Sequence, residues 1–222
     1  MGNSDNKSVK IAIQKDGRLT QDTVSLLRAA GLSFENYNRK LFVKCRNYPA
    51  EVLYVRDDDI PYYVASGIAD LGIVGQNVLR ESGFRVNTLL DLGFCRCSLV
   101  IAVPQNSNIS RASDLRNSTI ATSYPNSAKE YFKENKIPIK IVNIKGAVEI
   151  APSLGFAHAI VDIVATGKTL VLNNLRILQK ISDSQALLIT PNEVTSKEKA
   201  KIIDDLKVKI SEVLGGKDYE YL

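Results

Sequence analysis

Histidine and cysteine are scarce in this sequence. His158 is the only histidine, and the three cysteines are Cys45, Cys95 and Cys97. The cysteines are odd in number and lack the spacing of metal ligands. Cys95 and Cys97 alternate with Arg96 as residues of a strand do. We therefore interpret the three cysteines as reduced, partly buried thiols.

Long runs of a single character are also missing. No segment is apolar enough to cross a membrane, and residues 1–6 are polar, without the apolar core of a signal peptide. N-myristoylation would need Ser or Thr where Asn6 stands. The 29 basic and 24 acidic residues are spread along the chain and give a net charge of +5, which favours a small anionic ligand over a nucleic acid. We therefore expect a cytoplasmic protein that binds neither membranes nor nucleic acids.

The remaining composition is that of an ordinary globular protein, with 45% hydrophobic residues, and 222 residues suffice for one large or two small domains. Apolar runs separated by turn residues predict an α/β fold. Residues 67–75 and 155–167 repeat one pattern, in which a Gly precedes an aliphatic strand, a second Gly and a helix start. This repeat predicts two similar lobes, each offering a Gly loop to a shared cleft.

The order of the predicted elements suggests how the lobes divide. We expect lobe 1 to comprise residues 1–98 and 185–222, including an amphipathic C-terminal helix over residues 197–214. Residues 99–184 would form lobe 2. Within lobe 2, residues 146–151 are expected to begin a helix.

The second copy of the repeat ends in a candidate phosphate site. Ile160–Val164 is an apolar run, broken only by Asp162, that predicts a buried strand. The loop Ala165–Thr169 follows and leads into a helix. Its backbone N–H groups, the helix dipole, two Thr hydroxyls and one Lys all suit an anion. The loop lacks Walker spacing, and ordinary turn and capping chemistry gives the same pattern.

Two further groups of charged residues precede predicted elements. Lys15 and Arg18 flank a Gly in the loop before a helix that we expect Thr20 to cap, which makes a second candidate anion site. Arg39 and Lys40 precede a strand, and the residues alone slightly favour a solvated strand entrance over an anion site. Three successive carboxylates, Asp57–Asp59, are interpreted as the start of a helix, with a Mg²⁺ site as the alternative.

These motifs together are familiar. From about Lys10 onward, the chain resembles the ATP phosphoribosyltransferase family. The resemblance rests on residues 14–19, 56–61, 70–75 and 121–125, and on a long family pattern in which every spacing is kept. The residues of that pattern are Glu149, Gly155, Ala157, Ile160, Asp162, Thr166, Gly167, Thr169 and Leu170.

The resemblance implies a two-lobed fold like that of type II periplasmic binding proteins, with a cleft between the lobes. It implies the first step of histidine biosynthesis: adenine N1 of ATP attacks phosphoribosyl pyrophosphate, giving phosphoribosyl-ATP and pyrophosphate. Adenine N1 carries no proton to be removed, so a chain with one histidine suffices. Mg²⁺ would be held through pyrophosphate rather than by protein ligands, and fixed cations would stabilise the leaving group.

The same resemblance assigns roles to the candidate residues. Arg18 and Arg39 would grip pyrophosphate, with Lys15 and Lys40 in support. Glu149 and Asp162 would bind the ribose hydroxyls, although a paired polar group at a strand end explains Asp162 as well. The residues expected around the 5-phosphate are Ala165, Thr166, Gly167, Lys168 and Thr169, and those expected on the nucleotide side are Asp70, Leu71 and Tyr124.

The chain departs from the family in two respects. His158 stands where an Asp is common, and we interpret it as a surface exchange rather than a catalyst. The C-terminal regulatory domain of long family members is absent, which fits either a truncated long form or a natural short form with a regulatory partner subunit. We also expect a homo-oligomer. The alternative functions are a non-catalytic anion-binding protein on the same scaffold and an effector domain of a transcription regulator, although no helix-turn-helix segment is found.

Overall fold

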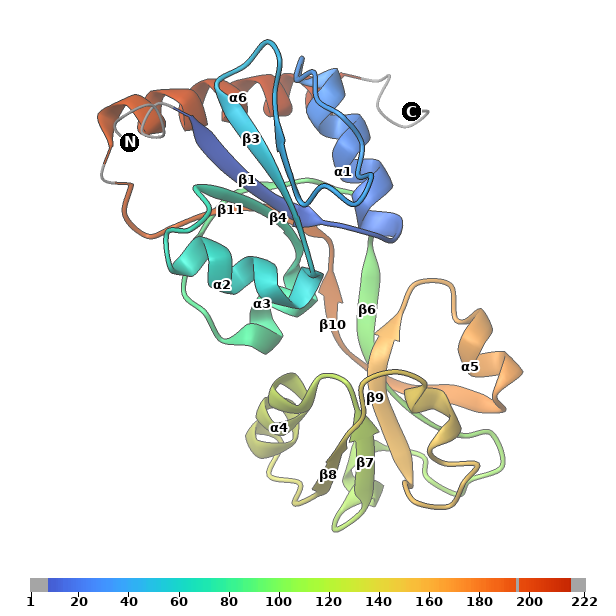
Figure 1. Ribbon diagram of the computed structural model, residues 1–222. Coiled ribbons are helices and arrows are strands. Elements are labelled where there is room, and N and C mark those ends of the chain that lie inside the picture. Colours follow the sequence, from blue (N-terminus) through green and yellow to red (C-terminus); the bar gives the residue numbers. More distant parts are fainter. Residues whose placement is uncertain (1–7, 195, 217–222) are drawn as a thin grey trace. The chain divides into compact units, whose positions relative to one another are not determined.

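The computed structural model describes residues 8–194 and 196–216 (Figure 1). The chain divides into two compact units: unit 1 is Met1–Cys95 with Gln185–Leu222, and unit 2 is Arg96–Ser184. The first boundary lies just before strand β6 (Cys97–Pro104), whereas a boundary after residue 98 would fall inside that strand. The whole of β6 therefore belongs to unit 2.

Unit 1 is built on a six-stranded sheet with the order β2-β3-β1-β4-β11-β5. Its strands are β1 (Val9–Gln14), β2 (Phe42–Lys44), β3 (Ala50–Val55), β4 (Leu71–Gly75), β5 (Asn87–Asp91) and β11 (Ala186–Thr190). Strands β3, β1 and β4 run parallel, whereas β2 is antiparallel to β3, and β11 is antiparallel to both β4 and β5. The parallel strands are apolar at almost every position because helices cover both faces of the sheet.

The helices of unit 1 are α1 (Arg18–Ala29), α2 (Ile60–Ala65), α3 (Gln76–Ser82) and α6 (Lys197–Gly215), with a 3-10 turn, η2 (Asp57–Asp59). α1 and α6 pack against the face that carries Ile11 and Ile13. α2 packs on the opposite face, against Ala12 (Figure 1). Successive residues of β1 thus enter two different cores, as the pleat of a strand requires.

Unit 2 has a five-stranded sheet with the order β10-β6-β9-β7-β8. Besides β6, its elements are β7 (Thr119–Thr122), β8 (Lys140–Asn143), β9 (Ala159–Val164), β10 (Leu175–Ser184), α4 (Pro125–Glu134), α5 (Lys168–Leu172), η3 (Ala112–Leu115) and η4 (Val148–Ile150). Phe132 of α4 packs on one face of the sheet, and Leu170 of α5 packs on the other. The helix expected to begin over residues 146–151 is wrong, because only the three-residue turn η4 forms there.

The two sheets share one topology. The order β3-β1-β4-β11-β5 in unit 1 corresponds to β8-β7-β9-β6-β10 in unit 2. In each unit the first three strands are parallel and the next strand is antiparallel to both of its neighbours. β4 and β9, which carry the two copies of the sequence repeat, occupy the same place in this order. The prediction of two similar α/β lobes is confirmed.

Candidate active site

A pocket of about 240 Å³ lies at the carboxyl end of β9 in unit 2. Its lining residues are Glu149, Asp162, Ile163, Val164, Ala165, Thr166, Gly167, Thr169 and Leu170. The structure thus brings together every site residue predicted from this stretch except Lys168. Ile163, Val164 and Leu170 were not predicted as site residues, because their apolar side chains signal only a strand and a helix.

The loop between β9 and α5 lines this pocket. Gly167 has φ 77°, a left-handed conformation that side chains other than Gly rarely adopt. Within the described residues, the backbone N–H groups of Thr166, Gly167 and Lys168 donate no hydrogen bond. α5 spans only five residues, so the helix dipole contributes less than the sequence suggested. The unbonded loop amides are therefore the main candidate donors for an anion.

Two carboxylates face the same pocket. The N–H of Ile163 donates to Oδ1 of Asp162 at 2.8 Å. Burial raises the pKa of Asp162 to about 6; the Ile163 hydrogen bond opposes this rise and the nearby Glu149 adds to it. No cation among the described residues contributes to this shift. Asp162 is therefore a carboxylate without a positive partner, which favours ligand binding over a paired structural role.

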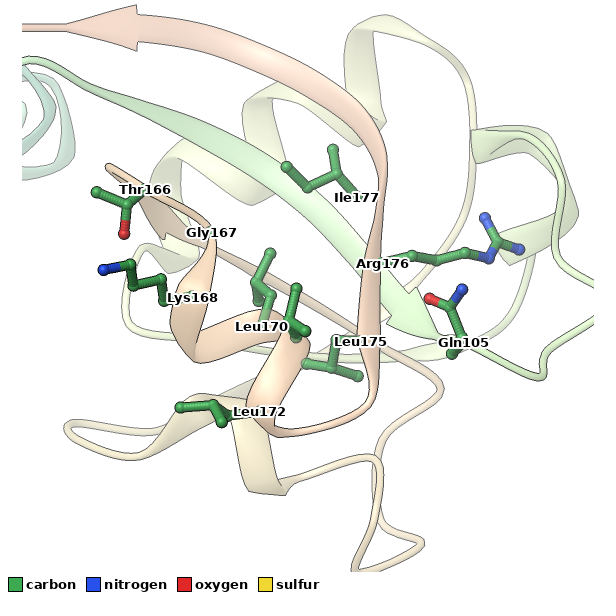
Figure 2. A pocket seen from close by; sticks show the side chains of 10 residues that line it. Gln105, Thr166, Gly167, Lys168, Leu170, Leu172, Leu175, Arg176 and Ile177 are labelled. Carbon is green, nitrogen blue, oxygen red and sulfur yellow. The ribbon is translucent and has the colours of Figure 1, made fainter.

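A neighbouring pocket of about 570 Å³ shares Thr166, Gly167 and Leu170 with the first pocket (Figure 2). The side chain of Lys168 lies beside that of Thr166 at one end of this pocket. Arg176 points toward the other end, where it donates to two backbone carbonyls of the loop after β6. Lys168 thus lines the larger pocket but not the smaller one.

The predicted cations of unit 1 gather at one edge of its sheet. Lys15 follows β1, and Arg18 is the first residue of α1. Arg39 and Lys40 precede β2, whose first residue pairs with Leu53 near the carboxyl end of β3. Because β1 and β3 are parallel, all four cations lie where these two strands end. This is the edge at which open α/β sheets bind ligands.

Most of these cations have weak ties within the protein. The Nζ of Lys15 lies 4.0 Å from Asp16, and that of Lys40 lies 3.5 Å from Glu35. Exposed pairs of this kind contribute at most about 1 kcal/mol, so an anionic ligand can displace them. Arg56 directly follows β3 and lies at the same edge. The sequence did not single it out as a candidate cation, since it appeared only within residues 56–61 of the family resemblance.

The three successive carboxylates do not form a metal site. Arg56 binds Asp58 with two hydrogen bonds of 3.0 and 3.1 Å, and the three Asp residues form η2 immediately before α2. In the part of the chain that the structure describes, no group of three or more His, Cys, Asp or Glu residues can hold a metal ion. The Mg²⁺ alternative for Asp57–Asp59 therefore has no support.

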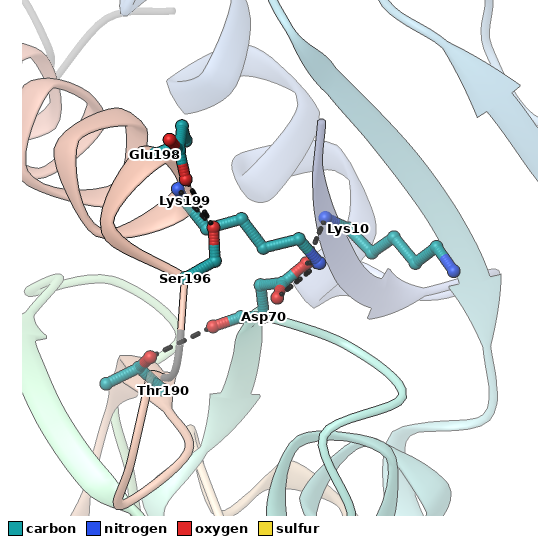
Figure 3. A network of polar contacts seen from close by, with 6 residues as sticks. All are labelled: Lys10, Asp70, Thr190, Ser196, Glu198 and Lys199. Carbon is teal, nitrogen blue, oxygen red and sulfur yellow. Dashed lines mark hydrogen bonds and ion pairs between the residues drawn. The ribbon is translucent and has the colours of Figure 1, made fainter. Parts of the chain in front are cut away.

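The side chain of Asp70 is bound by residues of unit 1 (Figure 3). Lys199 of α6 places its Nζ 2.9 and 3.0 Å from the two carboxylate oxygens of Asp70, and the N–H of Lys10 donates to one of them. Leu71 is fully buried. These contacts favour a structural role for both residues, and the expected contact with a nucleotide stays a prediction.

The structure also gives the local contacts of Tyr124, His158 and Thr20. Tyr124 follows β7 at the sheet edge where the phosphate loop lies, and its N–H donates to the hydroxyl of Thr122. His158 accepts a hydrogen bond from the N–H of Thr119 at 3.1 Å. It lies at the amino ends of β7 and β9, away from the loop, which fits a structural role. Thr20 does not cap α1, because the helix already begins at Arg18.

Comparison with known proteins identifies the family of this chain. The family model described as HisG, ATP phosphoribosyltransferase, matches residues 56–212. An ATP phosphoribosyltransferase of Cytophaga hutchinsonii is 41% identical over 96% of this chain and 74% of its own length. The chain belongs to the ATP phosphoribosyltransferase family. An ATP phosphoribosyltransferase of Methanosarcina barkeri is 39% identical to this chain, over 96% of this chain and 74% of the relative's length.

Solved structures agree with this assignment. The transferase matches a chain of the ATP phosphoribosyl transferase (HisG:HisZ) complex from Thermotoga maritima with a TM-score of 0.80 and 29% identity, over 93% of this chain and 98% of that one. The substrate-binding protein of an amino acid ABC transporter matches with a TM-score of 0.61 and 16% identity, over 96% of both chains. The second likeness shows the fold alone and confirms its periplasmic-binding-protein type.

The activity follows from the family. The transferase condenses ATP with phosphoribosyl pyrophosphate to give phosphoribosyl-ATP and pyrophosphate, the first step of histidine biosynthesis. The comparisons do not support the non-catalytic alternative. Among the described residues, no helix combines the length and the apolar character that crossing a bilayer requires. A cytoplasmic location stays a prediction.

Proposed function

We propose that the β9–α5 loop holds the 5-phosphate of phosphoribosyl pyrophosphate during this reaction. The observation that carries the proposal is the set of unbonded N–H groups of Thr166, Gly167 and Lys168 beside a pocket of about 240 Å³. Successive backbone amides form concave anion sites of this kind. The hydroxyls of Thr166 and Thr169 complete the donors, and Lys168, which lines the neighbouring pocket, adds a charge.

The two carboxylates of the pocket bind the ribose. The carboxylates of Asp162 and Glu149 accept hydrogen bonds, and the hydroxyl groups of the ribose can donate them. Asp162 accepts only from the adjacent Ile163 N–H in the described structure, which leaves its other oxygen for a hydroxyl. The ribose is thereby oriented with its phosphate on the loop amides.

The cations of unit 1 stabilise the leaving group. As adenine N1 forms its bond to C1′ of the ribose, the bond from C1′ to pyrophosphate breaks and its electron pair leaves with pyrophosphate. Arg18 and Arg39, with Lys15 and Lys40, would neutralise that growing negative charge, an effect worth several kcal/mol in comparable sites. No protein base is needed, since N1 has no proton to lose.

Mg²⁺ fits this site as a companion of the substrate. The described residues offer no cluster that could enclose a metal, whereas Mg²⁺ is commonly bound through substrate phosphates with few protein ligands. When bound, it would supply further charge neutralisation on pyrophosphate.

We also propose self-association and, because the Thermotoga maritima structure is of a HisG:HisZ complex, a regulatory partner subunit.

Pyrophosphate release from ATP and phosphoribosyl pyrophosphate tests the assignment of residues. Arg18→Ala should lower turnover by orders of magnitude while the fold survives, because α1 begins at this residue without needing its side chain. Thr169→Val should raise the KM for phosphoribosyl pyrophosphate, because it removes one donor from the loop. Arg85→Ala, an exposed change elsewhere in unit 1, is the control. Near-wild-type turnover of a folded Arg18→Ala variant would rule out the pyrophosphate role.

A further inference from the structure

The corner between β1 and α1 is braced by a side chain that does not cap the helix. The hydroxyl of Thr20, in the first turn of α1, donates to the backbone carbonyl of Gln14, the last residue of β1, at 2.9 Å. The N–H of Thr20 bonds to the carbonyl of Gly17 at 3.2 Å. One residue therefore fastens both ends of the loop that carries Lys15 and precedes Arg18.

The remaining contacts of this loop show why such a brace matters. Gly17 has φ 117°, a conformation that only Gly adopts readily. The side-chain amide of Gln14 lies directly beneath it, 3.3 Å from where a Cβ would be. The N–H of Lys15 bonds to Val55 of β3 at 2.8 Å, but the exposed Asp16 contacts Lys15 only at 4.0 Å. Between Lys15 and Arg18, the loop is thus held by backbone geometry and by Thr20.

We propose that Thr20 is a positioning residue, which fixes Lys15 and Arg18 in the arrangement that pyrophosphate requires. The proposal rests on the proposed function of these two cations. Thr20 acts through the backbone of the loop, because its hydroxyl donates to the carbonyl of Gln14. Misplacing a charged group by about 1 Å can cost on the order of a hundredfold in rate. Loss of the Thr20–Gln14 hydrogen bond should therefore lower turnover much more than it lowers the stability of the fold.

The chain offers a matched control in the same unit. The hydroxyl of Thr190 donates to the carbonyl of Asp70, also at 2.9 Å, in the buried network of Figure 3. Thr190→Val removes a hydroxyl-to-carbonyl bond of the same length from the backbone of Asp70, whose side chain stays bound by Lys199 and Lys10. Comparing Thr20→Val with Thr190→Val therefore separates positioning from general loss of stability.

The test measures kcat/KM and the melting temperature of both variants. We expect Thr20→Val to lower kcat/KM about ten- to a hundredfold, with no greater loss of melting temperature than Thr190→Val, which should keep its turnover. Thr20→Ser keeps the hydroxyl and should restore most of the activity. Equal turnover in the two Val variants, or a Ser variant as impaired as Val, overturns the proposal. If Thr20→Val does not fold, Thr20→Ala replaces it.

A double variant keeps this failure distinct from that of the proposed function. In an Arg18→Ala background, Thr20→Val should have much less effect than alone, because its action passes through the cations of the loop. Full additivity overturns positioning but leaves the role of Arg18 intact. An Arg18→Ala variant with normal turnover instead removes the proposed function of the loop, whatever Thr20 does.

Discussion

Replacing Asp162 by Asn should make the protein more stable and a worse enzyme. In the native state, burial raises the pKa of Asp162 from its ordinary value of 3.8 to about 6. Each pKa unit corresponds to about 1.4 kcal/mol. Holding Asp162 ionised therefore costs the native state about 3 kcal/mol well above pH 6. Asn keeps the acceptor for the Ile163 N–H and removes this cost.

The sign of the pH dependence follows from linkage. Because the pKa is higher in the folded state, folding is favoured most below pH 3.8, and this contribution is lost as the pH rises through about 6. Asp162→Asn should thus match the wild type near pH 4 and exceed it by up to about 3 kcal/mol at pH 8. Urea unfolding at pH 4, 6 and 8 measures the difference directly.

Asp114 supplies a control of opposite sign in the same unit. The N–H of Ser110 and the side chain of Arg111 hold the pKa of Asp114 down to about 2. Asp114→Asn should lower stability at pH 8, because its carboxylate stabilises the fold above pH 4 and loses that effect only as the pH falls through about 2. If Asp162→Asn and wild type differ equally at all three pH values, the desolvation argument is refuted. In the Asp162→Asn variant, the KM for phosphoribosyl pyrophosphate should also rise.

Two further predictions concern the packing of unit 1. Lys199→Met leaves the buried Asp70 carboxylate without its cation and should cost about 3–5 kcal/mol in urea unfolding; a loss below about 1 kcal/mol would show that the pair is solvated. Gly72→Ala would place a Cβ 2.7 Å from Cγ2 of Val64 and 2.8 Å from Cγ2 of Ile60, and should lower stability by about 1–3 kcal/mol. Gly215→Ala, which meets no atom within 4 Å at the end of α6, should be neutral or stabilising by up to about 1 kcal/mol, and equal stability of the two Ala variants would contradict the packing argument.

Local sequence patterns predicted the strands whose own residues are mostly apolar and buried. The apolar run Ile160–Val164, predicted as a strand, forms β9 (Ala159–Val164), whose first three positions are buried. β5 escaped prediction, since its positions are only half-buried or exposed and it begins and ends with polar residues. Residues 146–151 contain apolar positions that suit a helix, but the chain makes only a short turn there before the turns that lead into β9. Such a turn depends on the neighbouring sheet rather than on periodicity.

The candidate site divides in the same way. The loop could be predicted as an anion site because it directly follows β9, whereas the ligand-binding role of Asp162 was implied only by the family resemblance. Grouping Arg39 with Arg18 requires knowing that β2 pairs antiparallel with β3 and that β3 lies beside β1. The bond between Lys199 and Asp70 joins residues 129 positions apart, which no local pattern reveals. Sequence therefore identified the chemistry of the residues, while strand pairing decided which of them share an edge.

The insertion of unit 2 into unit 1 has a consequence for synthesis on the ribosome. Unit 2 is one continuous segment, but the sheet of unit 1 still lacks β11 when all of unit 2 has been made. That missing strand belongs between β4 and β5. Until Thr190 has emerged, a nascent chain displays two unpaired strand edges around a gap, which invites pairing with other chains. Translation of the inserted segment thus prolongs the interval in which β4 and β5 lack the strand that joins them.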